Sequence, residues 1–288
     1  MGAGGEPSYG LWPSPAIQAK IAIGPRPGNA MTACPDHFIA LAHALADAAR
    51  PVIRQYFRTP VDVDDKADAS PVTIADREAE AAMRVLIKAR FPEHGIFGEE
   101  HGRENCDAEY VWVLDPIDGT KAFITGKPSF GTLIALCKNG VPILGVIDQA
   151  ITDERWIGGV GHPTTLNGVP VRTRPCDALA KAYAYTTGPE YFDDATRPGW
   201  DRIAARVKLP RYGCDCYAYA LVATGFVDLV AEAGLKPYDY CALVPVIENA
   251  GGKVTDWQGA AVTIDSPGTI CAAGDARLHA LALEVLRG

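Results

Sequence analysis

The feature that most constrains the fold of this 288-residue chain is a short apolar run that ends in two aspartates. The run from Val111 to Leu114 predicts a buried strand, and Asp115 and Asp118 follow it across a turn that contains proline. Two carboxylates at one strand end repel each other and lose hydration, so a fold that places both there usually supplies a cation. Mg²⁺ is the best candidate, because it prefers oxygen ligands and this stretch holds neither cysteine nor histidine.

The residues after the second aspartate predict an anion beside that cation. Gly119 and Thr120 open a short helix, and the free N–H groups at its start would face the same point and favour phosphate. The stretch therefore predicts a site for a metal ion and a phosphate group. An Asp-rich connection without any ligand is the alternative that these residues alone leave open.

Composition limits the classes of protein to which the chain can belong. An apolar fraction of 48% and a charged fraction of 22% are ordinary for a soluble globular protein, with one large domain or two smaller ones. A net charge of -8 argues against nucleic-acid binding. No run approaches the roughly 18 apolar residues needed to cross a membrane. We therefore expect neither a nucleic-acid partner nor a membrane anchor.

The cysteines and the first residues bear on the compartment. Eight cysteines are spread along the chain without a Cys-x-x-Cys pair, which predicts reduced thiols in a cytoplasmic protein. Residues 1–34 are interpreted as a disordered leader or a misassigned start rather than a transit peptide, because Met31 lies just before the first convincing helix.

Two helices are predicted before the aspartates. Apolar residues at helical spacing predict one from Asp36, which can cap it, to Tyr56, with Pro51 as a possible kink. Thr73 starts the second, which ends at Phe91. The acidic stretch between them, residues 62–68, favours a solvated loop or hairpin over a metal site.

The rest of the chain divides into two patterns. Apolar segments between residues 131 and 158 are separated by turns and predict an antiparallel meander, and Asn167-Gly168 predicts a type I′ hairpin turn. From about residue 180, strands and helices alternate as in an α/β unit. We expect an α+β subdomain over residues 35–178 with most of the metal ligands, and an α/β subdomain over 179–288.

These motifs also carry a resemblance. Asp115-Pro-Ile-Asp118-Gly-Thr120 resembles the first signature of the inositol monophosphatase family of Mg²⁺-dependent, lithium-sensitive phosphatases. Three further pieces match in the right order over residues 36–286: Ser70 to Asp76, Gly98-Glu99-Glu100 and Pro237-Tyr-Asp239. The resemblance implies a layered α-β-α-β-α sandwich like that of fructose-1,6-bisphosphatase, of mixed α+β and α/β class, and a homodimer.

The resemblance also implies roles for individual residues. One Mg²⁺ would bind Glu99, Asp115 and the carbonyl of Ile117, and a second would bind Asp115, Asp118 and Asp239, while the family allows a third, weaker ion near Glu99. Asp76 and Thr120 would orient the attacking water, and the N–H groups of Gly119 and Thr120 would hold phosphate. Read without the family, Asp76 could serve only to complement the dipole of its helix.

Spacing separates two phosphatase chemistries. Enzymes that form an aspartyl-phosphate use Asp-x-Asp with one intervening residue, whereas two residues separate Asp115 and Asp118. Direct attack by water is therefore favoured over a covalent intermediate.

The substrate is predicted from a branch of the family. Residues 121–133, 213–219 and 228–239 resemble the histidinol-phosphate phosphatase branch, which removes phosphate from L-histidinol phosphate in histidine synthesis. Histidinol carries an ammonium and an imidazole, with which Asp215 and Glu232 could pair. A role for Asp215 as the cap of a helix beginning near Tyr217 stays open.

Two other functions are compatible with the sequence. An inositol monophosphatase or a 3′-phosphonucleotide phosphatase would keep the same catalytic machinery. A catalytically silent ligand-binding protein on the same fold is disfavoured, because every acidic residue of the motifs is retained.

Overall fold

The computed structural model describes residues 33–60, 63–65 and 71–288. The predicted leader at 1–34 lies almost wholly outside this range, as does part of the acidic stretch at 62–68. Within the described residues none of the helices has both the length and the apolar run that crossing a bilayer requires.

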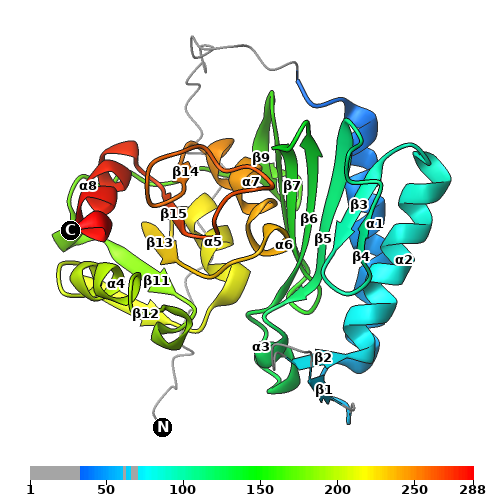
Figure 1. Cartoon of the computed structure of the whole chain (residues 1–288), viewed down its shortest axis with the longest axis horizontal. Helices are drawn as coiled ribbons and strands as arrows, with labels where there is room; N and C mark the ends of the chain where they lie inside the picture. Colours follow the sequence, from blue (N-terminus) through cyan, green and yellow to red (C-terminus); the bar gives the residue numbers. More distant parts are fainter. Residues whose placement is uncertain (1–32, 61–62, 66–70) are drawn as a thin grey trace, which may run out of the picture. The chain divides into compact units, whose positions relative to one another are not determined.

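Two long helices cover one face of the larger sheet (Figure 1). Helix α1 spans Asp36–Tyr56 and continues through Pro51, while α2 spans Ile74–Arg90. The predicted cap of α1 is wrong, because Pro35 occupies the N-cap position and Asp36 is already helical. For α2 the prediction is confirmed, since Thr73 caps the helix and its hydroxyl accepts a hydrogen bond from the N–H of Ala75.

The larger sheet has eight strands in the order β10-β9-β8-β7-β6-β5-β3-β4. The predicted meander is confirmed, because β5 to β10 pair antiparallel in sequence order, while β3 runs parallel to β5. Positive φ angles of 49° at Asn167 and 80° at Gly168 fit the predicted hairpin turn. The strands are β3 (Gly95–Gly98), β4 (Gly102–Glu104), β5 (Tyr110–Asp118), β6 (Gly131–Lys138), β7 (Val141–Gln149), β8 (Glu154–Gly159), β9 (His162–Leu166) and β10 (Val169–Pro170).

A smaller sheet of five strands follows in the order β12-β11-β13-β15-β14. Its strands are β11 (Tyr183–Thr186), β12 (Leu209–Tyr212), β13 (Leu229–Glu232), β14 (Lys253–Thr255) and β15 (Ile270–Ala273). A separate two-stranded ribbon joins β1 (Val63–Asp65) to β2 (Pro71–Thr73) ahead of α2.

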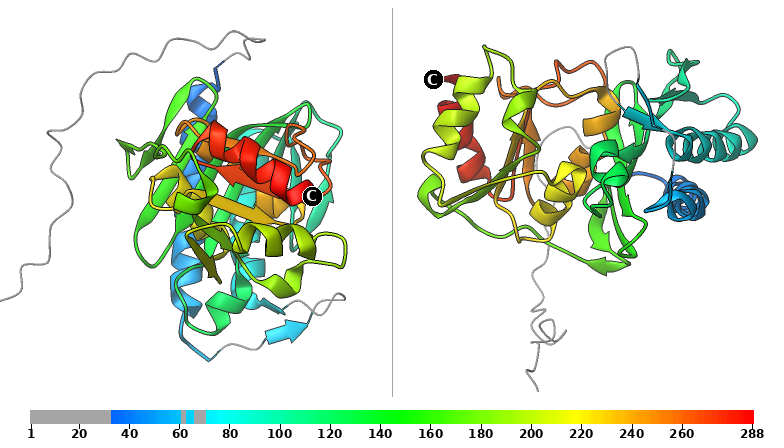
Figure 2. Two further views of the ribbon diagram at one scale, coloured as in Figure 1. Left: turned by 90° about the vertical axis from the view of Figure 1, so that its left-hand side faces the viewer. Right: turned by 90° about the horizontal axis from the view of Figure 1, so that it is seen from below.

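The remaining helices lie between the sheets or outside the smaller one. The segment around Asp239 forms two short helices, α6 (Pro237–Tyr240) and α7 (Leu243–Glu248). With α5 (Asp215–Ala223) these helices fill the space between the two sheets (Figure 2). Helices α4 (Arg197–Ala204) and α8 (Ala276–Arg287) cover the outer face of the smaller sheet, and the short elements are α3 (Thr120–Ile124), η2 (Leu179–Lys181) and η3 (Pro189–Tyr191).

The resulting order of layers is α1/α2, eight-stranded sheet, α5/α6/α7, five-stranded sheet, α4/α8, which is the predicted α-β-α-β-α sandwich. The structure explains why the run Val111–Leu114 of β5 is uniformly apolar. Val111 and Val113 enter the core shared with the middle helices, whereas Trp112 and Leu114 enter the core under α1 and α2. A strand that is buried on both faces needs apolar residues at every position.

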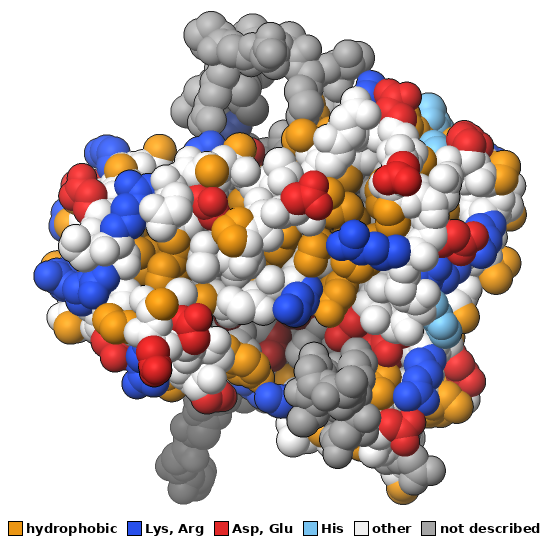
Figure 3. Space-filling view, in the orientation of Figure 1, with side chains coloured by type: hydrophobic (Ala, Val, Ile, Leu, Met, Phe, Trp, Pro, Cys, Tyr) orange, Lys and Arg blue, Asp and Glu red, His pale blue; other side chains and the backbone are white. Residues whose placement is uncertain are grey.

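Charged side chains of both signs are interspersed on the face shown in Figure 3. Acidic and basic groups lie side by side there among apolar and uncharged atoms, and on the described surface in this view no continuous basic area forms.

Candidate active site

A bulge at the end of β5 places both aspartates of the motif on one side. Asp115 pairs with Leu133 of β6 and Asp118 pairs with Gly131, so three steps along β5 correspond to two along β6. In a regular strand, residues three positions apart point to opposite faces. The extra residue cancels this alternation, and both carboxylates end up beside each other.

A third carboxylate joins them from the other half of the chain. Asp239 lies in α6, and one oxygen each of Asp115, Asp118 and Asp239 fall within 4.8 Å of one another. A backbone N–H holds each side chain: that of Ile117 donates to Asp115 (3.0 Å), that of Cys216 to Asp118 (2.7 Å) and that of Lys236 to Asp239 (2.7 Å). The remaining lone pairs are available to a ligand.

Among the described residues, the three carboxylates have no basic partner to offset their charge. In the described part of the chain, no lysine, arginine or histidine forms an ion pair with any of them. Burial, followed by repulsion from neighbouring carboxylates, raises the pKa of Asp115 and that of Asp118 well above the ordinary value, and burial also raises the pKa of Asp239. A cluster of oxygen ligands that disfavours its own ionisation suits a hard dication such as Mg²⁺.

Glu99 reaches the same cluster from β3. This strand lies parallel to β5, and the Glu99 N–H donates to the carbonyl of Leu114 (3.1 Å). The Glu99 carboxyl group contributes to the raised pKa of Asp115, both by its charge and through a hydrogen bond between the two side chains. The sequence prediction that groups Glu99 with the aspartates agrees with this placement.

The turn that presents Glu99 depends on a residue that the motifs did not single out. Buried Glu80 of α2 accepts hydrogen bonds from the N–H groups of Glu100 (2.7 Å) and His101 (3.1 Å), and from Arg84 (2.7 Å). A Cβ at Gly98 would lie 2.0 Å from a Glu80 carboxylate oxygen, so a larger residue there would force this carboxylate to move. Helical spacing marks Glu80 as a core-side position of α2, but no local pattern points to this role.

Asp76 links the start of α2 to the metal-binding turn. One of its oxygens accepts hydrogen bonds from the N–H (2.9 Å) and hydroxyl (2.6 Å) of Thr73, which completes a capping box. Its other oxygen lies 3.3 Å from Thr120 Oγ1, which also donates to the carbonyl of Ile117 (3.2 Å). Asp76 therefore does cap its helix, and it contacts Thr120 as well.

The predicted phosphate-binding turn adopts a conformation that requires glycine. Gly119 has a φ of 87° and occupies the N-cap of α3, whose first N–H groups have no carbonyl partner within the helix. Thr120 is the first residue of α3. The structure thus places Gly119 and Thr120 next to Asp118, at the mouth of the cluster.

A cavity of about 280 Å³ opens from the carboxylate cluster towards the segments that follow β11 and β13. Asp215 and Glu232, the two predicted substrate-binding residues, both line it, together with Glu99, Asp118 and Asp239. The cavity is also bordered by Lys121 and by Tyr191, whose hydroxyl accepts a hydrogen bond from the Lys121 ammonium (2.8 Å).

Asp215 does not cap a helix near Tyr217. Helix α5 already begins at Asp215, whose φ of 46° lies in the left-handed region, and its carboxylate accepts a hydrogen bond from Ser129 Oγ (2.9 Å). Burial raises the pKa of Asp215 to about 6. The capping alternative is wrong, because the side chain turns towards Ser129 and the cavity.

Glu232 lies at the end of β13 and is buried. Its two carboxylate oxygens accept hydrogen bonds from the N–H of Thr187 (2.7 Å) and the hydroxyl of Tyr219 (2.7 Å). Ser129, Tyr219 and Tyr191 were not predicted as site residues. Ser129 and Tyr219 lie within the stretches that resemble the histidinol-phosphate phosphatase branch, but the sequence does not show their contacts, which are with residues 86 and 13 positions away. Tyr191 belongs to no motif and contacts Lys121, 70 positions away.

This constellation can be compared with known proteins. A sequence model of the inositol monophosphatase family matches residues 35–287. The chain belongs to the inositol monophosphatase family. It is therefore a phosphatase of a family that generally uses metal ions, and Asp115, Asp118 and Asp239 form a cluster that could hold one.

Individual members of the inositol monophosphatase family show the extent of the similarity. The chain is 56% identical over 260 residues to the bifunctional phosphatase IMPL2, chloroplastic, of Arabidopsis thaliana, which covers 87% of the chain and 75% of that protein. It is 35% identical over 236 residues to the histidinol-phosphatase of Chlorobaculum parvum, with coverage of 81% and 91%. A solved structure of an inositol monophosphatase from Zymomonas mobilis superposes with a TM-score of 0.81 at 48% identity, over 88% of this chain and 98% of that one.

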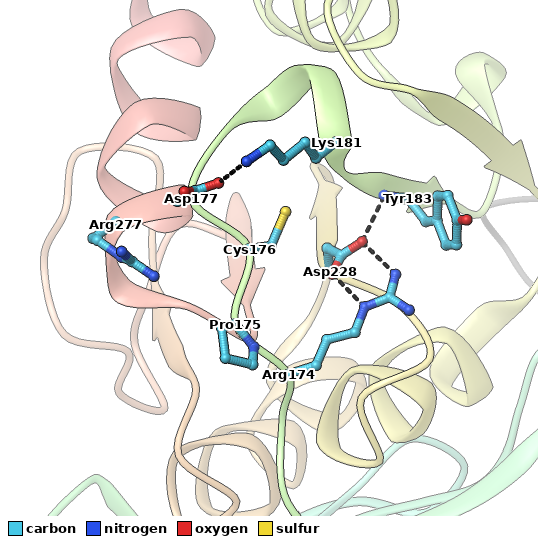
Figure 4. Close-up of a pocket in the computed structure, with 8 residues that line it drawn as sticks. All are labelled: Arg174, Pro175, Cys176, Asp177, Lys181, Tyr183, Asp228 and Arg277. Atoms are coloured by element: carbon cyan, nitrogen blue, oxygen red, sulfur yellow. Dashed lines mark hydrogen bonds and ion pairs between the residues drawn. The ribbon is translucent and has the colours of Figure 1, made fainter.

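A second cavity, of about 350 Å³, lies away from the family's motifs, between the segment before η2 and the start of α8 (Figure 4). Asp228 is buried there and binds both Arg174 Nε (2.7 Å) and Nη2 (2.6 Å). Asp177 pairs with Lys181 (2.8 Å), and Arg277 pairs with Asp275 (2.6 Å). Each acidic side chain that lines this cavity therefore has a basic partner.

Proposed function

We propose that this phosphatase hydrolyses L-histidinol phosphate to L-histidinol and phosphate, with Mg²⁺ as its cofactor. The observation that carries the proposal is the pair of carboxylates, Asp215 and Glu232, which line the same cavity as the acidic cluster and the phosphate-binding turn. A substrate that bears cationic groups beyond its phosphate would match their charge.

The metal ligands would be the residues that the motifs predict. Glu99, Asp115 and the carbonyl of Ile117 would hold one Mg²⁺, while Asp115, Asp118 and Asp239 would hold a second, and a third, weaker ion would sit near Glu99. When bound, Mg²⁺ neutralises charge on the phosphate group and acidifies water at neutral pH. The all-carboxylate donor set and the absence of basic partners for Asp115, Asp118 and Asp239 among the described residues support this assignment.

The groups of the chain would position the reactants. Thr120 Oγ1 would accept a hydrogen bond from the attacking water while its own proton is directed to Asp76, which lies 3.3 Å away. The N–H groups of Gly119 and Thr120 would hold phosphate oxygens, as helix starts do. Holding water and phosphorus in line converts a bimolecular reaction into an intramolecular one, which lowers the barrier.

Charge distinguishes the proposed substrate from its main rival. Inositol monophosphate is a neutral polyol apart from its phosphate, so Asp215 and Glu232 could only accept hydrogen bonds from its hydroxyl groups. The similarity to the histidinol-phosphatase of Chlorobaculum parvum supports the cationic ester, whereas the similarity to the Zymomonas mobilis structure keeps inositol monophosphate as the second candidate.

The test is phosphate release with Mg²⁺ present or chelated, comparing L-histidinol phosphate, inositol 1-phosphate and 3′-phosphoadenosine 5′-phosphate by kcat/KM. We expect a preference of about 100-fold or more for histidinol phosphate, equivalent to about 2.7 kcal/mol of transition-state binding. A flat profile, or preference for another ester, would remove the substrate assignment and leave the metal chemistry in place.

The proposal also covers the oligomeric state of the enzyme and its location in the cell. We propose a homodimer, which the family resemblance implies, and a cytoplasmic location, which the cysteine pattern predicts; sedimentation and cell fractionation would check them. The Arabidopsis relative carries the word chloroplastic in its name, so a plastid fraction belongs in the second experiment.

A further inference from the structure

We propose that Ser129 and Tyr219 are positioning residues that hold the two specificity carboxylates in place. The proposal rests on the proposed function of Asp215 and Glu232, and adds the residues through which the chain fixes their direction. Neither hydroxyl belongs to the motif that binds metal and phosphate.

Asp215 is held in a conformation that its backbone does not favour. A φ of 46° is uncommon for a residue other than glycine, and persists only where surrounding contacts enforce it. One such contact is the 2.9 Å hydrogen bond from Ser129, which is itself buried. Ser129 lies 86 residues earlier in the chain, so this bond joins the segment before β6 to the start of α5.

On its other side, Asp215 rests against the phosphate-binding turn. A Cβ placed on Gly119 would lie 2.7 Å from the carboxyl carbon of Asp215, so the carboxylate occupies the space that glycine leaves empty. Asp215 is thereby wedged between Gly119 and Ser129. These contacts fix the position of the Asp215 carboxylate relative to the phosphate-binding turn.

Glu232 is held by the same kind of bond from a different residue. The Tyr219 hydroxyl is buried and donates to one carboxylate oxygen (2.7 Å), while the N–H of Thr187 donates to the other (2.7 Å). Burial raises the pKa of Tyr219 well above its ordinary value, which keeps the hydroxyl protonated as a donor. Each oxygen of Glu232 retains lone pairs for a cationic ligand.

The hydrogen bonds from the two hydroxyls therefore fix the orientation of the carboxylates before the substrate binds. Without the donor, the carboxylate can rotate away, and substrate binding then includes the cost of ordering it. The expected signature is a rise in KM for the ester that the carboxylates select, with little change in kcat.

The experiment uses the full chain with saturating Mg²⁺ and measures kcat and KM for L-histidinol phosphate and inositol 1-phosphate. In Ser129→Ala and in Tyr219→Phe we expect KM for histidinol phosphate to rise by about 10-fold, with kcat changed by less than about threefold. Ser129→Thr, which retains a hydroxyl, should restore most of the loss. Tyr217→Phe is the matched control, because Tyr217 lies on the same helix and donates to Glu154 (2.6 Å), away from the cavity.

A double-mutant cycle tests whether Ser129 acts through Asp215. In an Asp215→Asn background, Ser129→Ala should add less than about twofold to KM, because the group that it positions has already lost its charge. An equal effect in both backgrounds, or an unchanged KM in both single variants, would overturn the proposal.

The same data separate this proposal from the proposed function. If the wild-type enzyme prefers inositol 1-phosphate, the histidinol assignment fails, and the cycle is then read on KM for inositol 1-phosphate. If the wild-type enzyme prefers histidinol phosphate and neither variant changes KM, the substrate assignment stands and the positioning role fails.

Discussion

The cavity at the end of β5 and the cavity beside α8 are both lined by acidic side chains, but these side chains differ in whether they have basic partners. Beside α8, buried Asp228 binds two nitrogens of Arg174, and Asp177 binds Lys181. At the end of β5, Asp115, Asp118 and Asp239 converge within 4.8 Å with no basic partner among the described residues. The first arrangement is complete in itself, whereas the second needs a ligand.

The difference shows how to recognise a functional cluster among structural ones. Cavity volume does not separate the two, since the paired cavity has about 350 Å³ and the other about 280 Å³. Charge balance does separate them. A buried carboxylate without a partner costs free energy, and such a group is retained only where ligand binding offsets that cost. Substitutions in the two cavities should therefore have different effects.

The largest effect is expected from Asp118→Asn. An amide still accepts the hydrogen bond from Cys216 but removes the charge that would bind Mg²⁺, so kcat/KM should fall by at least about 1,000-fold, or ~4 kcal/mol. Without Mg²⁺, the free energy of unfolding should stay equal or rise, because repulsion within the cluster is relieved. Normal activity in this variant would show that the metal assignment is wrong.

Asp228→Asn should have the reverse profile. It leaves the Arg174 guanidinium without its counter-charge, and we expect a loss of about 3 kcal/mol in urea unfolding, at the low end for buried pairs because Arg174 is partly exposed. Steady-state kinetics should change by less than about twofold. The double variant Arg174→Met/Asp228→Asn should recover part of the stability, and failure to do so would mean that the ion pair is not what the aspartate supports.

Removal of Mg²⁺ should affect the two cavities unequally. At a concentration 100 times its Kd, an ion that binds only the folded state adds about 2.7 kcal/mol of stability, which chelation removes. Thermal unfolding with and without EDTA measures this difference. The shift should disappear in Asp118→Asn and persist in Asp228→Asn, and any other distribution would place the ion elsewhere.

A smaller effect, measured through pH, tests helix α8, whose Arg277 borders the paired cavity. Burial lowers the pKa of His279 in α8 to about 4, so the folded protein disfavours protonation that the unfolded chain accepts below about pH 6.5. Its contribution to stability is therefore present above pH 6.5 and declines as pH falls towards 4, by about 2 kcal/mol between pH 7 and 5. His279→Gln should flatten this decline, whereas His101→Gln, at an exposed position, should leave it unchanged.

Local sequence patterns predicted much of the fold, for reasons visible in single elements. Helix α2 has a cap at Thr73 and a buried stripe, and β5 is apolar on both faces, so short-range patterns specify both. Strands β4, β12 and β14 were missed, since each has only three or four residues and depends on pairing with a neighbour. Polar residues in β4 and a proline in β12 also lack the usual strand signal.

The metal cluster was more predictable than the substrate end. Asp115 and Asp118 belong to one short motif, although the bulge that turns them to the same side could not be read from it. The cap proposed for Asp215 was wrong because the competing donor, Ser129, lies 86 residues away. Contacts of this kind depend on how layers pack, which a local pattern does not encode.

Asp76 illustrates a wider consequence of sharing atoms between tasks. One of its oxygens secures the first turn of α2 and the other contacts Thr120, so a single substitution removes a helix cap and a proposed catalytic contact together. In a genetic screen that records only growth or protein abundance, this position would be classed with residues needed for folding. Selection cannot relax one task without weakening the other, and a descendant that abandoned catalysis would still have a reason to keep this aspartate.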